Sequence, residues 1–352
     1  MKIKMDKKDL FRLLDNIKSG DDDEVTGTFS KHDKVLIIDG LNLFLRNFAV
    51  LNYVNQGGVH VGGLGGFLRS LSFLINTNKP TSVYIVFDGV GSSVNRKNLL
   101  PEYKSGRNQT RMTNHDTFDD LDEEHESKVN QISRLIHYLR CLPVNLIMLD
   151  KVEADDIIAH LSRYMTTKYD SKCTIVSADK DFLQLVNDNI TVYSPIAKEY
   201  YTPKLVKEKF GLPAHNFILY KTLMGDNSDK IPGVQGLGPK KLFKLFPELA
   251  EREMTLEEVF EISESKYKDN IIYSRVVFNN ESIRNNYLIM DLGNPLVDEG
   301  EKKHIESIVE QPIERTKTAE FIKLYNEDGL HHTIKNVEYW IRDTFKVLNS
   351  FK

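Results

Sequence analysis

Five short segments of the sequence carry acidic side chains in a number and spacing that suit divalent metal ions. Together they hold nine acids: Asp39, Asp88, Glu153, Asp155, Asp156, Asp179, Asp181, Asp226 and Asp229. Hard oxygen donors of this kind favour Mg²⁺ or Mn²⁺ over zinc, which draws on His and Cys. Because magnesium takes few carboxylates directly and keeps several waters, nine acids indicate two ions, with some acids acting through water. Two such ions can hold the attacking and leaving oxygens of a phosphodiester in line.

Three of these acids stand where apolar runs end. Asp39, Asp88 and Asp179 come at the ends of unalternating apolar runs, which cover residues 35–38, 83–87 and 173–176. Such runs suit strands that are buried on both faces, as in a parallel sheet. One aspartate in this position is usually a turn former or a helix cap. Three at the exits of parallel strands are expected to face one crevice.

The segment Glu153-Ala154-Asp155-Asp156 precedes apolar residues at helical spacing, so its acids occupy the first turn of a predicted helix. There the helix macrodipole favours negative charge by about 0.3–1 kcal/mol, and capping explains one or two acids. Three acids in four residues, with Lys151 as the local cation, repel one another unless a further cation binds. Metal binding is therefore the better interpretation of this segment.

The strand-like runs alternate with helical stretches at 64–75, 129–139 and 155–165. This alternation predicts an α/β fold with a mostly parallel central sheet flanked by helices. The paired glycines within residues 57–66 lack the Lys-Ser/Thr ending of a phosphate-binding loop. They indicate a turn followed by a tightly packed helix start.

Residues 231–241 (Ile-Pro-Gly-Val-Gln-Gly-Leu-Gly-Pro-Lys-Lys) predict a hairpin between two helices. The glycines permit close backbone approach, and Pro239 suits a first helical position. Amides at that helix start, followed by lysines, offer a phosphate site that is independent of base sequence. The candidate nucleic-acid contacts of this hairpin are Gly233, Gly236, Gly238, Lys240 and Lys241.

A second basic cluster lies between the Asp88 strand and the helix near residue 129. It holds Arg96, Lys97, Lys104, Arg107 and Arg111, with Tyr103 among them. A basic segment that arches over a metal site could bind a nucleic-acid strand and stack a base on Tyr103. The alternative is a solvated loop that happens to be basic. The acidic stretch 116–126 is expected to be solvated or mobile.

The composition of the 352-residue chain is ordinary for a soluble globular protein, with 40% hydrophobic and 28% charged residues. A net charge of −4 does not exclude nucleic acid, because clustered carboxylates can mask a separate basic surface. Cys141 and Cys173 give neither zinc spacing nor a disulfide framework, which indicates a reducing cytoplasm. No apolar run approaches the ~20 residues needed to cross a bilayer, and no signal-peptide pattern is present, so we expect no membrane partner.

Three regions are expected along the chain. Residues 1–32 form an N-terminal extension with apolar residues at helical spacing. It is either a short packed helix or frayed tail, or a docking peptide for a sliding clamp or a single-strand-binding protein. Residues 33–195 form the α/β core with an arch near 91–128. Residues 196–352 form a helical DNA-binding region with a helix-hairpin-helix near 231–246.

In combination, these motifs resemble those of the 5′-to-3′ exonuclease and flap-endonuclease superfamily over residues 34 to 290. The matching motifs are Ile38-Asp39-Gly40, Phe87-Asp88-Gly89, Tyr103-Lys104-Ser105-Gly106-Arg107, Glu153-Ala154-Asp155-Asp156, Ser177-Ala178-Asp179-Lys180-Asp181, Gly225-Asp226-Asn227-Ser228-Asp229 and the hairpin at Gly233. The stretch 285–288 (Asn-Asn-Tyr-Leu) is similar to the bacteriophage RNase H type. The sequence departs from the family pattern in the extension before residue 33 and in the acidic stretch after Arg111.

The resemblance implies a PIN-like fold with a helical arch and a C-terminal helical region that contains the helix-hairpin-helix. It implies a first metal site formed by Asp39, Asp88, Glu153, Asp155, Asp156 and Asp179. A second site is completed by Asp181, Asp226 and Asp229, with Asp179 between the ions. Lys104 and Arg107 match residues that reach the scissile phosphate, and Arg46 matches a basic residue near the reacting strand. The hairpin would hold duplex DNA and a K⁺ ion.

The implied activity is that of a monomeric structure-specific 5′-nuclease that depends on Mg²⁺, with Mn²⁺ as a substitute. It would cut DNA flaps, nicked duplexes and RNA primers by two-metal-ion catalysis during replication in a bacterial or phage-infected cell. One alternative is a PIN-type ribonuclease, which shares the acidic sheet edge but needs neither the hairpin nor residues 103–107. The other is a non-catalytic binder of branched DNA, which should have lost several of the nine acids; all nine are present.

Overall fold

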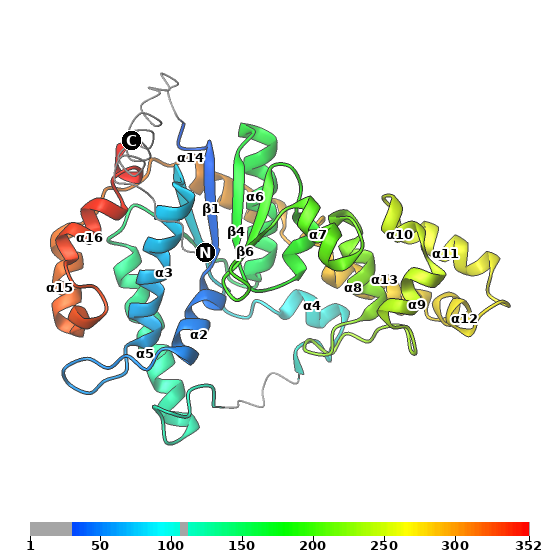
Figure 1. Cartoon of the computed structure of the whole chain (residues 1–352), viewed down its shortest axis with the longest axis horizontal. Helices are drawn as coiled ribbons and strands as arrows, with labels where there is room; N and C mark the ends of the chain where they lie inside the picture. Colours follow the sequence, from blue (N-terminus) through cyan, green and yellow to red (C-terminus); the bar gives the residue numbers. More distant parts are fainter. Residues whose placement is uncertain (1–29, 106–111, 352) are drawn as a thin grey trace, which may run out of the picture. The chain divides into compact units, whose positions relative to one another are not determined.

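Six strands form one sheet in the order β3-β2-β1-β4-β5-β6 (Figure 1). The computed structural model describes residues 30–105 and 112–351. The strands are β1 (Lys34–Asp39), β2 (Ser82–Val86), β3 (Asn145–Ile147), β4 (Lys172–Val176), β5 (Ile190–Ser194) and β6 (Glu199–Tyr201). The first five are parallel, and β6 pairs antiparallel with β5. The mostly parallel sheet predicted from the apolar runs is confirmed, and β2 is buried along its whole length.

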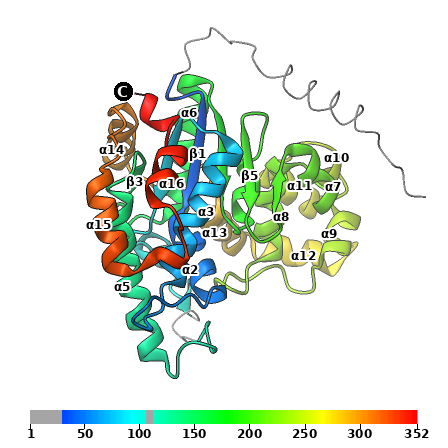
Figure 2. The same cartoon turned by 60° about the vertical axis from the view of Figure 1, so that its left-hand side comes forward.

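Alternate residues of the strands pack into two separate cores. Leu36 and Ile38 of β1 belong to the core that contains α2 (Gly40–Val50), α3 (Gly62–Asn78) and α5 (Leu121–Leu139). The helices α15 (Thr318–Asp328) and α16 (Val337–Thr344) add to this core (Figure 2). Val35 and Ile37 face the other core, with α6 (Ala154–Tyr169) and α14 (Glu299–Glu310). The predicted sandwich of helices around the sheet is therefore present.

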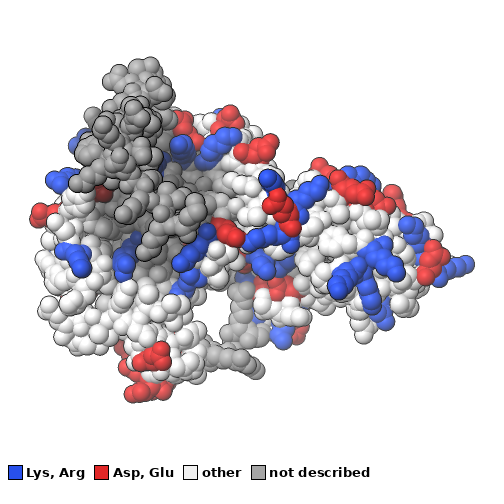
Figure 3. Space-filling model, in the orientation of Figure 1, with Lys and Arg blue, Asp and Glu red and all other residues white. Residues whose placement is uncertain are grey.

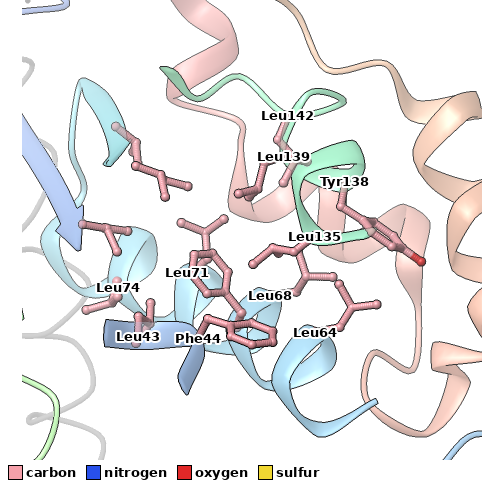
Figure 4. Packing of buried hydrophobic residues seen from close by; sticks show 14 of the residues in the cluster. Leu43, Phe44, Leu64, Leu68, Leu71, Leu74, Leu135, Tyr138, Leu139 and Leu142 are labelled. Carbon is pink, nitrogen blue, oxygen red and sulfur yellow. The ribbon is translucent and has the colours of Figure 1, made fainter. Parts of the chain in front are cut away.

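The first core is built mainly from leucine and aromatic side chains. Figure 4 shows residues of α2, α3 and α5 that meet in it, together with Leu142 just after α5: Leu43, Phe44, Leu64, Leu68, Leu71, Leu74, Leu135, Tyr138 and Leu139. Burying a side chain of this size stabilises a fold by roughly 1.5–3 kcal/mol. This packing holds α2, and with it the end of β1, in a fixed position.

The glycines before and within α3 form the predicted turn and tightly packed helix start. Gly58 has a φ of +77° in the turn. A Cβ atom on Gly62 would lie 1.8 Å from the carbonyl oxygen of Leu51, and one on Gly66 would lie 2.5 Å from the Leu51 side chain. Glycine is required here because α3 lies against the chain that leaves α2.

Helices make up the regular structure after β6. They are α7 (Pro203–Phe210), α8 (Phe217–Met224), α9 (Pro239–Leu245), α10 (Glu248–Glu251), α11 (Leu256–Ser265), α12 (Ile271–Phe278) and α13 (Asn280–Met290), followed by α14 to α16. Of the 3₁₀ turns, η2 (Asp181–Leu185) lies between β4 and β5, η3 (Ala214–Asn216) and η4 (Leu330–His332) lie between helices, and η5 (Leu348–Ser350) follows α16. The helices α8 to α13 share a third core around Leu223, Leu242 and Phe246. The loop 225–238, which contains the predicted hairpin, joins α8 to α9.

The boundaries at residues 32 and 195 stay predictions. Residues 31–352 form one unit by their own contacts, and β6 lies beyond residue 195. Most of the predicted N-terminal extension lies outside the described residues. Among the residues that are described, no helix is both long and apolar enough to cross a membrane.

The acidic stretch 116–126 differs in part from the prediction of a solvated or mobile segment. Asp120 caps α5 by accepting hydrogen bonds from the backbone amides of Asp122 and Glu123. Glu124 is only 1% exposed, and its Oε1 accepts hydrogen bonds from the amides of Thr113 and Asn114 at 2.9 and 3.1 Å. The prediction is wrong for Glu124, because composition does not reveal that one acid turns inward to bind the backbone of Thr113 and Asn114.

A Gly62→Ala substitution tests the close approach of α3 to the end of α2. Overpacking against a backbone carbonyl should lower the free energy of unfolding by about 1–3 kcal/mol, as measured by urea denaturation. Gly57→Ala is the matched control, because its Cβ would meet only the Asn55 side chain at 3.3 Å. Equal stabilities of the two variants would show that the space beside Gly62 is not limiting.

Candidate metal centre

A pocket of about 150 Å³ lies where β1, β2 and β4 end. Six of the nine predicted acids line it: Asp39, Asp88, Asp155, Asp179, Asp181 and Asp229. They come from the ends of three parallel strands, the first turn of α6, η2 and the loop after α8. The structure therefore brings together acids that are up to 190 positions apart in the sequence. Glu153, Asp156 and Asp226 stand beside this pocket and do not line it.

Local hydrogen bonds orient the acids at the strand ends. Asp39 is the last residue of β1 and caps α2, so that its Oδ1 accepts from the Asn42 amide at 3.0 Å. Its Oδ2 accepts from the Ser177 hydroxyl at 3.0 Å. Asp88 Oδ1 accepts from the amide of Ala154 at 2.9 Å, which links the end of β2 to the start of α6. These bonds hold the carboxylates at the pocket rather than in solvent.

Burial and mutual repulsion disfavour the ionised form of several of these acids. Burial, opposed by two hydrogen bonds and reinforced by Asp88 and Asp179, raises the pKa of Asp39 to about 7. Burial and the charges of Asp179 and Asp39 raise the pKa of Asp155 well above its usual value. Burial and Asp179 likewise raise the pKa of Asp181 to about 6. A cation in the pocket would relieve this repulsion.

Arg96 neutralises the acids beside the pocket. Its guanidinium donates to both oxygens of Asp156, at 2.5 and 3.0 Å, and lies 3.2 Å from Glu153 Oε2. Its Nε donates to the carbonyl of Ile289 at 2.9 Å, and the side chain is buried. Asp156 Oδ1 also accepts from the amide of Leu296 at 3.0 Å. Arg96 thus ties α4 (Val94–Leu99) to α6 and α13.

Tyr103 and Lys104, which follow α4, are also bound to Glu153. The hydroxyl of Tyr103 and the ammonium of Lys104 both donate to Glu153 Oε2, at 3.1 and 2.9 Å. The amide of Lys104 donates to the carbonyl of Asp229 at 3.0 Å. Tyr103 and Arg96 are both buried and both line the pocket. Their predicted contacts with nucleic acid stay predictions; in this structure both side chains bind the acids beside the pocket.

A lysine that the sequence analysis did not single out lies between two further acids. Lys221 of α8 places its Nζ 2.7 Å from Asp181 Oδ1 and 2.6 Å from Asp226 Oδ2. Burial lowers the pKa of Lys221, but the two carboxylates outweigh this and raise it above the usual value. Although burial opposes it, Lys221 together with Ser228 lowers the pKa of Asp226 to about 2.

The donor set suits divalent cations that bind oxygen. Among residues 30–105 and 112–351, no three His, Cys, Asp or Glu side chains lie close enough together to hold a metal ion as they stand. Magnesium nevertheless needs only one or two carboxylates and keeps several waters. Six acids around one pocket, three of them with raised pKa values, provide such donors. These donors therefore fit divalent ions that are held largely through water.

The other predicted contacts lie away from the acids. Arg46 of α2 lines a neighbouring hollow with Phe73 and Lys198. Lys97 is exposed on α4. Lys240 and Lys241 are exposed at the start of α9, where Figure 3 shows Lys and Arg side chains gathered on the surface. The turn before them contains Gly236, which has a φ of +77°. A Cβ atom added to Gly233 would lie 2.1 Å from the carbonyl oxygen of Met224, whereas one added to Gly238 would have no other atom within 4 Å. Arg107 lies outside the described residues.

Sequence reasoning missed residues that line the pocket and residues that bind its acids from beside it. Asn42 lines the pocket and accepts a hydrogen bond from the amide of Ala178. Ser177 orients Asp39, and Lys221 bridges two acids. Ile289, Met290 and Leu292 close the pocket from the end of α13. Ser177 stands inside a matched motif and Asn42 follows one by two residues, so their positions were a usable signal; the residues of α13 offer no comparable signal.

Removing the Arg96 guanidinium should strongly destabilise the fold. Arg96→Met leaves Glu153 and Asp156 buried with less neutralising charge, which should lower the free energy of unfolding by about 3–5 kcal/mol in urea denaturation. Lys97→Met is the control, because the neighbouring Lys97 is exposed, and it should change stability by less than about 0.5 kcal/mol. If both variants were equally stable, the ion pairs of Arg96 would not matter for the fold.

Comparisons with known proteins agree with this geometry. Residues 34–211 match the family described as 5′-3′ exonuclease, N-terminal resolvase-like domain. The DNA polymerase I of Bacillus subtilis (strain 168) is 34% identical over 249 residues, which cover 69% of this chain and 26% of that protein. The 5′-3′ exonuclease of Buchnera aphidicola subsp. Acyrthosiphon pisum (strain APS) is 33% identical over 212 residues, 60% of this chain and 68% of that protein.

The chain thus spans about a quarter of the length of the polymerase relatives it matches. Among solved structures, the bacteriophage T5 flap endonuclease, in a complex with DNA and metal ions, superposes with a TM-score of 0.60 at 18% identity. The superposition covers 86% of this chain and 100% of the T5 chain, which shows a shared fold. From the family match and the Buchnera relative, the chain belongs to the 5′-3′ exonuclease family.

Proposed function

We propose that the chain is a structure-specific 5′-nuclease that hydrolyses phosphodiesters in DNA flaps, nicked duplexes and RNA primers. The observation that carries this proposal is the single pocket lined by six carboxylates, with Lys104 at its rim. Mg²⁺ is the proposed cofactor, because these donors are carboxylates rather than His or Cys, and Mn²⁺ should replace it. The names of the relatives, a 5′-3′ exonuclease and a flap endonuclease, support the same activity.

The carboxylates at the strand ends are proposed to hold the cations, with Asp179 shared between two positions. Such ions lower the charge of the phosphodiester and make water a better nucleophile. Asp39, Asp88 and Asp155 sit on the strand and helix ends, so their positions depend on the sheet and not on a loop. That rigidity favours the alignment of the reacting phosphate with its neighbours.

Lys104 is the proposed electrostatic partner of the scissile phosphate. Its ammonium is 2.9 Å from Glu153, its side chain is 19% exposed, and its backbone amide donates to the carbonyl of Asp229. A phosphate entering the pocket would offer a second anion to the same ammonium. Lys104 could therefore stabilise negative charge that develops during hydrolysis. Arg107 is proposed for the same role from the family motif alone.

The loop 225–238 and the start of α9 are the proposed grip on duplex DNA. Lys240, Lys241 and Lys244 are exposed there, next to a helix start whose amides can face phosphate. A K⁺ ion at this loop, a clamp or single-strand-binding partner, a monomeric state and a bacterial or phage-infected cytoplasm remain part of the proposal. The bacterial relatives support the last of these.

Cleavage of a 5′-labelled flap substrate tests the proposed activity. The wild-type chain should release the flap with Mg²⁺ or Mn²⁺ and lose activity in EDTA. Asp179→Asn should lower the cleavage rate by about 10²–10³-fold, since it removes charge at the centre of the pocket. The control is Asp188→Asn, an exposed acid in the turn before β5, which should cleave at the wild-type rate.

Activity that persists in EDTA, or full activity of Asp179→Asn, would contradict the proposal. If the chain bound branched DNA but did not cleave it with any divalent metal ion, the alternative of a non-catalytic DNA-binding protein would be favoured. Cleavage of single-stranded RNA in preference to flaps would favour the PIN-type ribonuclease.

Loss of the α9 lysines should weaken DNA binding rather than the chemical step. The double variant Lys240→Ala/Lys241→Ala should raise the Kd for a flap substrate. It should also reduce the steepness with which the logarithm of the binding constant falls with the logarithm of the salt concentration, by roughly 1 per lysine. The maximal rate at saturating DNA should change little. Lys303→Ala on α14, also exposed, is the control. An unchanged salt slope in the double variant would rule out α9 as a phosphate contact.

A further inference from the structure

The predicted ligands differ in whether the protein already supplies a cation to them. Glu153, Asp156, Asp181 and Asp226 form ion pairs with Arg96, Lys104 or Lys221. Asp39, Asp88, Asp155 and Asp179 have no such partner in that part of the chain. Arg96 and Lys104 oppose the rise in the pKa of Asp155 without pairing with it. The four aspartates thus lack a directly paired cation among the described residues, whereas Asp181 and Asp226 of the second metal position are paired with Lys221.

Lys221 provides that neutralisation at the second position. Its side chain is 16% exposed, and its ammonium lies 2.7 Å from Asp181 and 2.6 Å from Asp226. The other oxygen of Asp226, Oδ1, accepts from the amide and hydroxyl of Ser228 at 2.8 and 2.6 Å. Both oxygens of Asp226 are thus in use, Oδ1 by Ser228 and Oδ2 by Lys221.

An ammonium and a divalent cation cannot occupy the same place between two carboxylates. A divalent ion that bridges Asp181 and Asp226 must displace Lys221 or share ligands with it at the cost of charge repulsion. No comparable displacement is needed at the four aspartates. The two positions should therefore differ in affinity even though both are rich in carboxylates.

We propose that Lys221 is a resident cation of the second metal position, so that divalent ions bind in order. The first ion binds at Asp39, Asp88, Asp155 and Asp179, and the second binds only as the Lys221 ammonium leaves Asp181 and Asp226. Lys221 is in this sense a positioning residue: its ammonium holds Asp181 and Asp226 together and reduces their charge until a divalent ion replaces the ammonium. This inference rests on the proposed function, because it assigns the metal positions of that same pocket.

Counting bound Mn²⁺ without DNA tests the proposal independently of activity. The signal of free Mn²⁺ in electron paramagnetic resonance gives the number of bound ions and their Kd values. The wild-type chain should bind one ion, and a second at least about tenfold more weakly, a difference of about 1.4 kcal/mol. Lys221→Met should tighten the second ion by about tenfold or more and leave the first unchanged. Lys221→Arg, which keeps the charge, should retain the wild-type pattern.

Two further variants make the test specific. Lys204→Met removes an exposed lysine of α7 and should not alter either Kd. The double variant K221M/D226N removes the lysine together with one acid, so the tightening should disappear. It also keeps the test usable if Lys221→Met alone does not fold, because it leaves one fewer unpaired carboxylate.

The outcomes separate this inference from the proposed function. A second ion that binds equally or more weakly in Lys221→Met than in the wild type overturns the role of Lys221, and leaves the nuclease proposal standing if flaps are still cleaved with Mn²⁺. Equal tightening by Lys204→Met would show a general charge effect and overturn it as well. A wild-type chain that binds no Mn²⁺ at all contradicts both proposals.

Discussion

The repulsion among buried carboxylates is the constraint on which the rest of this structure depends. Each of the nine acids can be accommodated alone, but together they require positive charge close by. The chain supplies part of it from its own residues. Arg96 and Lys104 neutralise Glu153 and Asp156 on one side, and Lys221 neutralises Asp181 and Asp226 on the other. The four aspartates Asp39, Asp88, Asp155 and Asp179 have no directly paired cation among the described residues.

The fold explains how such a cluster can be held without collapsing or opening. Parallel strands β1, β2 and β4 end at one edge, and the two cores on either side of the sheet fix that edge. The ion pairs of Arg96 then draw α4 and α13 onto α6. The elements that neutralise the acids are therefore also those that join the helical region to the sheet. A substitution that changes the charge balance around the acids should therefore also change the stability of the tertiary structure.

The sequence was informative where function depends on local position, and uninformative where it depends on distant contacts. Asp39, Asp88 and Asp179 could be placed because each ends an apolar run, and the sheet brings such ends together. Arg96 and Tyr103 were assigned to nucleic acid because a basic loop usually faces solvent, yet both are buried against acids more than 45 positions away. Lys221 lies on a helix with no unusual pattern, and its partner Asp181 is 40 positions earlier. Glu124 was misjudged for the same reason, since nothing in an acidic run shows which member turns inward.

The most direct test of the central claim is to locate divalent ions in crystals of the chain soaked with Mn²⁺, from the anomalous scattering of manganese. The account predicts a strong peak among Asp39, Asp88, Asp155 and Asp179, and a weaker one near Asp181 and Asp226 that grows with Mn²⁺ concentration. A soak that leaves the pocket without any peak, or that places manganese only at surface acids, would contradict the assignment of this pocket as the metal centre of a nuclease.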